Sequence, residues 1–600
     1  MFKEEVPTRF PSRQDGNYPR PQLMRKGWAD LCGPWNFVFD DADEGVRQQW
    51  WSNFPTYNRL IEVPFPFESP KSGIDDQGFH PIIWYSRTIS AKEIASAGFM
   101  EGKRLLVHFG AVDYSCDIWV NGHCLKHNEG GHVPFTVDIT SVADLNSEVT
   151  LVVRVEDDPA DVEKPRGKQD WHLEPHSIWY KRTSGIWQPV WIESVPSLYV
   201  DSVQWYTDLP GGRVSASIVL SGVPDEVIDV SVDLLLEGTT VGFAAVKSRN
   251  RTITISLDIA QLQNGQAQQE VLWCPENPVL FDAIITAGKD EVTSYFGIRT
   301  VEAKDGVFKL NGLPYYIRAV LSQGYWPESC LAAPTNEALR NEVELIKQLG
   351  FNSARVHQKY EDPKLLYWAD KLGVIIWEEA PSCFAFSSDS VVRTISEWTR
   401  IIERDFSHPS VCVWVPLNES WGVQQIASSR EMQKFAEGMV AITKTLDNTR
   451  VVSSNDGWEQ VNTDLVGIHD YDEDHDSIRS KYETRKSVLK LIEGVGPAGR
   501  RLVLRGDYHD LPFMLTEFGG ISLLDTGQDD SWGYSNANSR NELEQRLGTL
   551  FEAVNAGSGI AGFCYTQLTD TEQEKNGLLD EFRNPKLPFN TLRRIVKGEK

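Results

Sequence analysis

The sequence contains no run of about 18 apolar residues, so it offers no candidate for a membrane-spanning helix. Its first residues, Met1 to Pro7, do not combine a basic start with an apolar stretch, and we expect no secretory signal there. The eight cysteines are scattered and form no Cys-x-x-Cys pair, so we expect them to be reduced, buried and inert. These absences favour a cytoplasmic location, although a presequence removed before residue 1 would leave no trace in them.

Positive charge is also scarce, because 59 Lys and Arg residues face 85 Asp and Glu residues, giving a formal net charge of −26. Such a balance argues against a nucleic-acid backbone or an anionic membrane as a partner. With 41% hydrophobic and 24% charged residues, the composition is that of a soluble globular protein. A chain of 600 residues exceeds what one hydrophobic core supports, so we expect several domains.

Residues 1–195 show short alternating runs separated by turn signals, which is typical of a β-sandwich. Asn121-Gly122 lies between two apolar runs and predicts a hairpin. The segment from Thr183 to Ile192 is expected to close the sandwich, with its alternate aromatic side chains facing inward. The clearest predicted strands cover 104–109, 116–120, 135–139 and 149–156.

Residues 196–302 give a second all-β pattern of about seven short strands without helical periodicity. This spacing indicates an immunoglobulin-like sandwich with a structural role. The predicted strands cover 199–205, 213–220, 227–236, 251–257, 270–273 and 293–297.

In residues 303–600 the apolar period changes, and strands alternate with helices. Asp362 and Pro363 are suited to start a helix, and Gly373 is suited to end it. Strict alternation predicts a parallel sheet, and eight strand–helix units favour closure into a (β/α)8 barrel. The eight candidate strands cover 315–321, 351–357, 374–379, 411–417, 450–454, 465–468, 511–518 and 559–566.

Two of these strands end in a glutamate instead of continuing into apolar sequence. The strand 411–417 runs into Asn418-Glu419, with Trp421 close by, and the strand 511–518 carries Glu517 before a glycine pair. The carboxyl ends of all strands in such a barrel open on one face, where catalytic groups gather. We therefore expect Glu419 and Glu517 to face each other across one pocket.

Two facing carboxyl groups suit hydrolysis of a glycosidic bond with retention of configuration, in which one group is an acid/base and the other a nucleophile. Burial and a neighbouring negative charge are expected to raise the pKa of Glu419, which makes it the candidate acid/base. Glu517 is the candidate nucleophile, and Gly519-Gly520 is expected to let the backbone approach a ligand. Asn418 is expected to hold the 2-hydroxyl of the sugar.

Other polar and aromatic residues near strand ends are candidates for substrate binding, each with a structural alternative. Arg355 is as well suited to a structural ion pair as to a sugar contact, and Glu379 to a salt bridge. The acidic run 570–574 would either close the pocket or form a solvated loop. The full set of candidate substrate-binding residues is Asn418, Arg355, His357, Glu379, His469, Tyr471, Trp421 and Gln567.

The domain order, together with Ser184-Gly185-Ile186-Trp187, Asn418-Glu419-Ser420 and Thr516-Glu517-Phe518-Gly519, resembles glycoside hydrolase family 2 over residues 27 to 595. This family contains β-galactosidases, β-glucuronidases and β-mannosidases. The resemblance implies a jelly-roll, sugar-binding-like first domain, the acid/base place for Glu419, the nucleophile place for Glu517 and a carbohydrate partner. It also implies a retaining exo-β-glycosidase, for which a galactose-like terminal sugar is the leading expectation.

Departures from the family pattern leave alternatives open. The stretch after the first barrel strand lacks the family's usual signature, the Asn-x-Lys signature of glucuronidases is not evident, and Gln567 stands where related barrels often carry tryptophan. Metal ligands of the family cannot be mapped, so no metal and no cofactor are expected. The alternatives are a β-glucuronidase, a related furanosidase or arabinosidase, a carbohydrate-binding scaffold, and a metal-dependent hydrolase using His357, Glu379 and His469. The sequence does not determine which glycosidic linkage is cleaved, or whether the chain forms a homo-oligomer.

Overall fold

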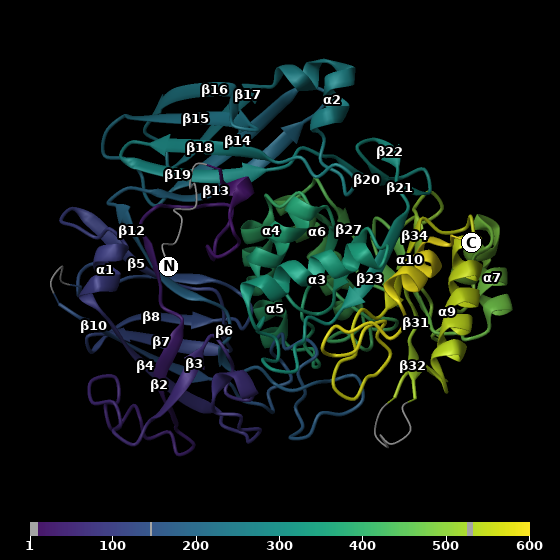
Figure 1. The fold of residues 1–600 in the computed structure, drawn as a ribbon, viewed down its shortest axis with the longest axis horizontal. Coiled ribbons are helices and arrows are strands. Elements are labelled where there is room, and N and C mark those ends of the chain that lie inside the picture. The colour runs from purple at the N-terminus through teal and green to yellow at the C-terminus, as the bar shows by residue number, and fades with distance from the viewer. Residues whose placement is uncertain (1–9, 144–146, 525–531, 600) are drawn as a thin grey trace.

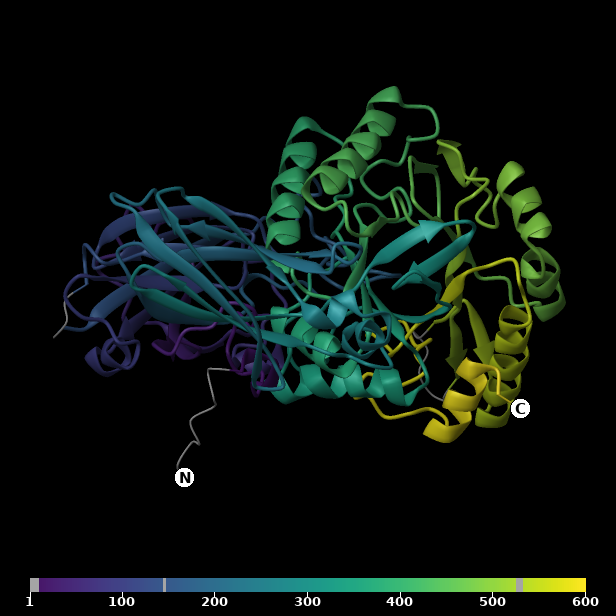
Figure 2. The same cartoon turned by 90° about the horizontal axis from the view of Figure 1, so that it is seen from above.

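The protein was analysed as a computed structural model, which describes residues 10–143, 147–524 and 532–599. The stretch Met1 to Pro7, where no secretory signal is expected, lies outside the described residues. The chain forms two β-sandwiches and a barrel, and Figure 1 shows the second sandwich (teal) lying against both the first (purple to blue) and the barrel (green to yellow). Figure 2, seen from above, shows helices surrounding the barrel strands.

The first sandwich confirms the predicted β domain. Asn121 and Gly122 join β7 to β8 with φ values of 49° and 81°, as a two-residue hairpin turn requires. The predicted closing strand is in fact two short strands, β11 (Gly185–Ile186) and β12, between which Trp187 lies buried. The larger sheet has the order β3 (Arg59–Val63), β2 (Gly33–Phe39), β4 (Ile82–Ile89), β10 (Val149–Glu156), β7 (Ser115–Val120) and β8 (His123–Glu129), and the smaller has the order β1 (Trp28–Asp30), β12 (Val190–Pro196), β5 (Lys103–Phe109) and β9 (Phe135–Asp138).

The second sandwich is immunoglobulin-like in its seven strands, but the predicted strand 270–273 is wrong. That stretch follows and partly overlaps helix α2 (Gly265–Val271), whose start is capped by the Asn264 side chain. Two strands were not predicted, because β16 is largely exposed on both faces and β18 shows no clear alternation. The sheets have the orders β13 (Val200–Asp208), β14 (Arg213–Leu220), β17 (Thr252–Asp258), and β16 (Thr239–Ser248), β15 (Ile228–Leu236), β18 (Phe281–Ala287), β19 (Asp290–Phe296).

The barrel sheet contains all eight predicted strands, every neighbouring pair of which is parallel. A strand buried on both faces needs a continuous apolar run, and the five residues of β26 (Val411–Val415) are all fully buried. The sheet order is β27 (Val451–Val452), β26, β25 (Ile375–Glu379), β24 (Ser353–Val356), β23 (Ile317–Ser322), β34 (Gly562–Thr566), β31 (Phe513–Gly519) and β29 (Val466–Asp470).

Helices follow the barrel strands and begin at the predicted caps. The Asp362 side chain accepts a hydrogen bond from the backbone N–H of Lys364, Pro363 is the first helical residue, and Gly373 ends the helix with φ of 78°. The charged stretch after β29 also contains helices. The helices of this domain are α3 (Asn336–Gln348), α4 (Pro363–Leu372), α5 (Ser388–Asp405), α6 (Arg430–Leu446), α7 (His475–Tyr482), α8 (Arg485–Glu493), α9 (Arg540–Asn555) and α10 (Phe589–Lys597).

The sequence predicts no membrane-spanning helix and buried, reduced cysteines. Within the described residues, no helix has the length and apolar character needed to cross a membrane. All eight cysteines are described and are free thiols, but the expectation that all are buried is wrong, because Cys124 is exposed and Cys32 and Cys274 are partly exposed.

The second sandwich is fixed to the barrel through Asp370 of helix α4, which is fully buried. Its carboxylate accepts hydrogen bonds from the hydroxyl of Tyr295 in β19, at 2.8 Å, and from the backbone N–H of Ser410, at 2.9 Å. The ring of His408 lies 2.5 Å from the same carboxylate, and the indole N–H of Trp273 donates to the Asp370 carbonyl at 2.7 Å. One side chain therefore satisfies donors from two domains.

We expect Asp370→Ala to lower the midpoint of urea unfolding clearly, because each buried donor left unpaired costs about 1–3 kcal/mol. Tyr295→Phe removes a single donor and should cost less, and Asp370→Asn, which keeps an acceptor oxygen, should fall between them. The measurement is tryptophan fluorescence against urea concentration. An unchanged midpoint in Asp370→Ala would contradict this account of the interface.

Candidate active site

Glu419 and Glu517 meet at the carboxyl ends of the barrel strands. Glu419 follows β26, and Glu517 lies near the end of β31. A carboxylate oxygen of each, together with a ring nitrogen of His469, lie within 4.8 Å of one another. The two glutamates therefore share one site, as the strand-end pattern predicted for them.

The backbone at Glu419 has an unusual conformation. Glu419 and Ser420 have φ values of 49° and 56°, in the left-handed region that residues with a Cβ rarely occupy. Hydrogen bonds to one neighbouring loop hold this turn: the Glu419 N–H donates to the carbonyl of Asp456, and the Ser420 N–H donates to the side chain of Asn455. The turn directs the Glu419 carboxylate into the site, where its side chain is 16% exposed.

Glu517 is held by two donors on opposite oxygens. A guanidinium nitrogen of Arg355 lies 2.9 Å from Oε1, and the Tyr471 hydroxyl donates to Oε2 at 2.6 Å. Tyr471 is stacked on Tyr534, with ring centroids 3.4 Å apart, which fixes the direction of its hydroxyl. The carboxylate is therefore both oriented and compensated in charge.

Gly519 and Gly520, which are expected to let the backbone approach a ligand, have a packing role in the structure. A Cβ added at Gly519 would overlap the ring of Tyr565, and one added at Gly520 would overlap the ring of Tyr534. Both glycines also have positive φ values, of 88° and 63°. The glycine pair makes room for the rings of Tyr565 and Tyr534.

Arg355 of β24 is fully buried and lies at the centre of the charged groups. Its guanidinium contacts Glu379 at 2.6 Å, Asp456 at 3.0 Å and Glu517 at 2.9 Å, and it donates to the side-chain oxygen of Asn418 at 2.6 Å. With no exposed surface, Arg355 positions the groups of the site and is not available to a sugar. This agrees with the structural alternative given in the sequence analysis.

Asn418 is oriented by this contact. Because its Oδ1 accepts from Arg355, its Nδ2 points elsewhere, and no hydrogen bond joins Nδ2 to any residue in the described ranges. The amide N–H groups of Asn418 are thus free to donate to a sugar hydroxyl.

His469, at the end of β29, connects both glutamates. Its Nδ1 lies 2.7 Å from Glu419 Oε1 and 3.4 Å from Glu517 Oε2, and its Nε2 lies 3.1 Å from Asp456 Oδ2. Burial by itself would lower the pKa of His469, but these three carboxylates outweigh burial and raise it to about 10. The imidazole is therefore protonated at neutral pH.

The expected direction of the Glu419 pKa is corrected by this cation. Burial raises the pKa of Glu419, but the hydrogen bond and charge of His469, with the charges of Lys168 and Arg355, outweigh burial and lower it. Glu419 is therefore ionised, and the proton is held by His469 next to it.

Three other candidates lie beneath the site. Glu379 is fully buried against Arg355, and His357 Nδ1 lies 2.8 Å from Glu379 Oε1. Gln567 is also fully buried; its Oε1 accepts from Gln323 at 2.7 Å, and its Nε2 has no partner among the described residues. Glu379 and Gln567 have no exposed surface and support the residues around them, whereas His357 keeps 4% of its surface exposed.

Trp421 belongs to a cluster of half-buried aromatic rings beside Glu419. Its ring centroid lies 5.4 Å from that of Trp179, 5.7 Å from that of Phe384 and 6.4 Å from that of Trp458. Trp179 comes from the first sandwich, so two domains build this aromatic surface. Flat apolar rings near an acid/base residue suit stacking against a sugar ring.

Several residues of the site escaped sequence reasoning. Asp456 follows the fifth strand, so the same strand-end pattern could have identified it. Lys168 and Tyr180 come from the first sandwich, where no pattern pointed to the site. The acidic run 570–574 contributes a buried residue, Glu574, which accepts hydrogen bonds from the Tyr180 hydroxyl and the Asn576 side chain.

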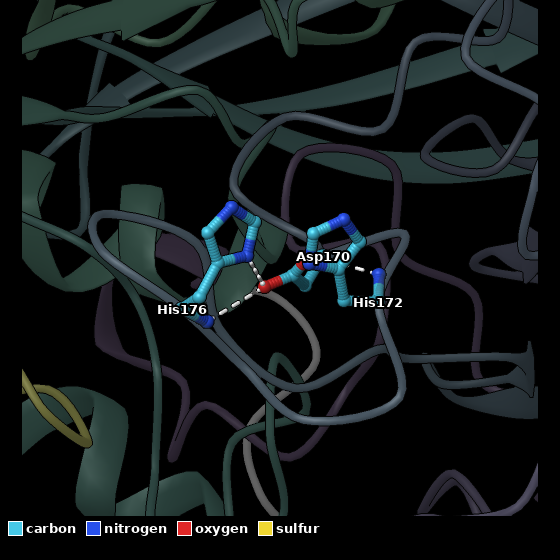
Figure 3. Close-up of side chains that lie close together, drawn as sticks. All are labelled: Asp170, His172 and His176. Atoms are coloured by element: carbon cyan, nitrogen blue, oxygen red, sulfur yellow. Dashed lines mark hydrogen bonds and ion pairs between the residues drawn. The ribbon is translucent and has the colours of Figure 1, made fainter.

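Within the described residues, two groups of side chains have the spacing of metal ligands. One is Glu419, His469 and Glu517, where a cation would have to displace the proton on His469. The other is Asp170, His172 and His176, shown in Figure 3, in which both oxygens of Asp170 already accept from backbone N–H groups and one also contacts the His176 ring. The proposed trio His357, Glu379 and His469 does not fit a cation, because the Arg355 guanidinium contacts both Glu379 and His469.

The chain was compared with known protein families. Three family models match consecutive segments: "Glycosyl hydrolases family 2, sugar binding domain" matches residues 28–196, "Glycosyl hydrolases family 2" matches residues 198–299, and "Glycosyl hydrolases family 2, TIM barrel domain" matches residues 301–522. The three segments follow the two sandwiches and the barrel.

Curated relatives agree with this family. The chain is 26% identical to the β-glucuronidase of Canis lupus familiaris over 495 residues, which cover 74% of this chain and 70% of that protein. It is 24% identical to the β-galactosidase of Thermoanaerobacter pseudethanolicus over 438 residues, which cover 69% of this chain but 54% of that protein.

Solved structures share the fold along nearly the whole chain. A β-glucuronidase from an uncultured Clostridium species has a TM-score of 0.74 at 19% identity and covers 96% of this chain and 98% of its own. A β-galacturonidase from Eisenbergiella tayi, bound to galacturonate, has a TM-score of 0.71 at 17% identity with the same coverage. From its three consecutive family matches and its three-domain fold, this chain belongs to glycoside hydrolase family 2, a family of retaining glycoside hydrolases.

Proposed function

We propose that this chain is a retaining exo-β-glycosidase with Glu517 as nucleophile and Glu419 as acid/base. The observation that carries this proposal is the approach of the two carboxylates to within 4.8 Å. Retaining enzymes need a separation of about 5–5.5 Å, whereas inverting enzymes leave room for a water molecule between carboxyl groups about 6.5–9.5 Å apart. The observed spacing supports direct attack on the sugar.

Glu517 is suited to attack the anomeric carbon, because Arg355 and Tyr471 stabilise its ionised form from both sides. Positive charge develops on the sugar as the leaving group departs, and the carboxylate then forms the covalent bond. The free amide N–H of Asn418 is suited to donate to the 2-hydroxyl, a contact that strengthens in the transition state.

Glu419 and His469 together hold the proton that the leaving group requires. The 2.7 Å contact between them lets the proton move from Nδ1 to the carboxylate without rearrangement. Bond formation at Glu517 removes a negative charge that favours protonated His469, so proton transfer towards Glu419 becomes easier as the sugar is bound covalently. Deglycosylation reverses these steps, with water in place of the leaving group.

Contacts between domains support removal of a terminal sugar. Tyr180 of the first sandwich donates a hydrogen bond to Glu574 of the barrel, whose charge acts together with that of Glu517, so the first sandwich contacts the barrel near the proposed nucleophile. Both a galactose-like sugar and a uronic acid agree with the relatives, which include a β-galactosidase and several β-glucuronidases. The uronide is favoured, because most of those relatives are β-glucuronidases and the similar solved structures include a β-galacturonidase.

We expect Glu517→Ala to lower kcat by about 10⁴-fold or more, since no carboxylate remains to attack the sugar. Added azide should partly restore turnover and give a glycosyl azide of inverted configuration, identified by NMR of the product. A product of retained configuration from this variant would remove Glu517 from the nucleophile role.

Glu419→Ala is expected to differ from Glu517→Ala in two ways: its loss of activity should depend on the leaving group, and its azide product should have the other configuration. Loss of the general acid should slow glycosides with poor leaving groups by about 10²–10⁴-fold, but should spare dinitrophenyl glycosides, whose leaving group needs no proton. With azide, the product should have retained configuration. Equal losses for good and poor leaving groups would contradict the acid/base assignment.

The glycone can be identified with a panel of 4-nitrophenyl glycosides that share one leaving group. We expect kcat/KM to be highest for a β-D-glucuronide or β-D-galacturonide, and lower for the matched β-D-glucoside and β-D-galactoside. A preference for the β-D-galactoside would instead support the galactose-like sugar, and a preference for an arabinofuranoside would support the furanosidase alternative.

A further inference from the structure

Lys168 lies at the active site although it belongs to the first sandwich. It is carried by the loop between β10 and β11, whose neighbouring residue Gly167 donates its N–H to the carbonyl of Ser382, at 3.1 Å. A Cβ at Gly167 would overlap the carbonyl oxygen of Gln358, so only glycine allows this approach. Gln358 and Ser382 follow strands β24 and β25, which places Lys168 at the carboxyl-end face of the barrel.

The loop around Lys168 is held rigidly. The guanidinium of Arg166 donates to four backbone carbonyls of the same loop. On the other side of Lys168, Asp170 accepts from the N–H groups of His172 and His176 and contacts the His176 ring, as Figure 3 shows. The position of the Lys168 backbone is therefore set before any ligand binds.

The ammonium group of Lys168 has no partner of its own. The residue is only 6% exposed, and no hydrogen bond or ion pair joins Nζ to any residue in the described part of the chain. Nζ lies over the face of Tyr180, 5.8 Å from the ring centroid. Nζ is not among the fully enclosed polar atoms of the described residues, so it reaches the solvent of the site, where an anionic ligand would give it a direct partner.

The other charged groups nearby are already paired. Arg355 and His469 are each shared among carboxylates, and Glu574 accepts from Tyr180 and Asn576. Burial lowers the pKa of Lys168, and the charges of the surrounding glutamates act against burial. A carboxylate on the substrate would give Lys168 the direct partner that these glutamates do not provide, because a carboxylate is the acceptor that binds an ammonium most strongly.

We propose that Lys168 binds the carboxylate of an acidic glycone, so that the first sandwich selects β-uronides for the barrel to hydrolyse. This rests on the proposed glycosidase function and names its substrate class. Lys168 is a specificity-determining residue in this assignment, whereas Glu419 and Glu517 carry out the reaction.

The test compares Lys168→Met with wild type on matched pairs of 4-nitrophenyl glycosides that differ only at C6, namely β-D-glucuronide with β-D-glucoside and β-D-galacturonide with β-D-galactoside. The ratio of kcat/KM for uronide to that for the neutral partner should fall about 10- to 150-fold, the range expected for one charge-assisted hydrogen bond. Lys181→Met, in the same loop, is the control and should leave the ratio unchanged. Equal losses on both members of a pair would overturn the proposal.

Inhibition of the unmodified enzyme by free sugars gives a second measurement that does not depend on the variant folding. Glucuronate or galacturonate should inhibit more strongly than glucose or galactose. Stronger inhibition by the neutral sugars would overturn the role proposed for Lys168, and this result does not require the Lys168→Met variant to fold. Azide rescue of Glu517→Ala on whichever glycoside is turned over tests the glycosidase mechanism separately, so failure of one proposal can be told from failure of the other.

Discussion

The buried guanidinium of Arg355 is the contact on which the rest of the site depends. It joins a carboxylate of β25, one of β31, one after β27 and the amide that follows β26. Three carboxylates in such a small, buried volume would repel one another and take up protons without a compensating cation. Because Arg355 is fully buried, its charge is little screened by water, and its planar fork fixes the geometry as well as the charge.

The same charge balance explains why the Glu419 pKa moves opposite to expectation. Sequence reasoning considered burial and the neighbouring carboxylate, both of which raise the pKa of an acid. It did not consider His469, which reaches Glu419 from a strand far away in the chain. His469 is protonated because Glu517 and Asp456 surround it, so the state of the proposed acid/base follows from the proposed nucleophile. The proton is therefore held on His469, 2.7 Å from the carboxylate that is proposed to deliver it.

The barrel and its two glutamates could be predicted because their signals are local. A fully apolar strand such as β26, followed by an acid, is visible in a few residues of sequence. Eight strand–helix units in succession then predict closure into a barrel. Strand β16 gave no signal because it lies at a sheet edge with few buried side chains. Lys168 and Tyr180 gave none because their importance comes from a contact between domains, and no pattern within either domain records which loop lies over the barrel.

The position of that loop gives the first sandwich a role beyond support. Trp179 packs on Trp421, two residues after Glu419. Lys168, in the same loop, lies in the field of Glu419, Glu517 and Glu574. A loop anchored on the barrel at Gly167 therefore brings both Lys168 and Trp179 to the side chains around Glu419. In a barrel the reacting groups come from the carboxyl ends of the strands, on one face of the sheet. Residues that contact the other sides of a bound sugar must therefore come from loops or from another domain. Here the first sandwich supplies some of these residues. Changes in its loop can therefore alter which sugar is recognised, while the catalytic carboxylates at the strand ends stay the same.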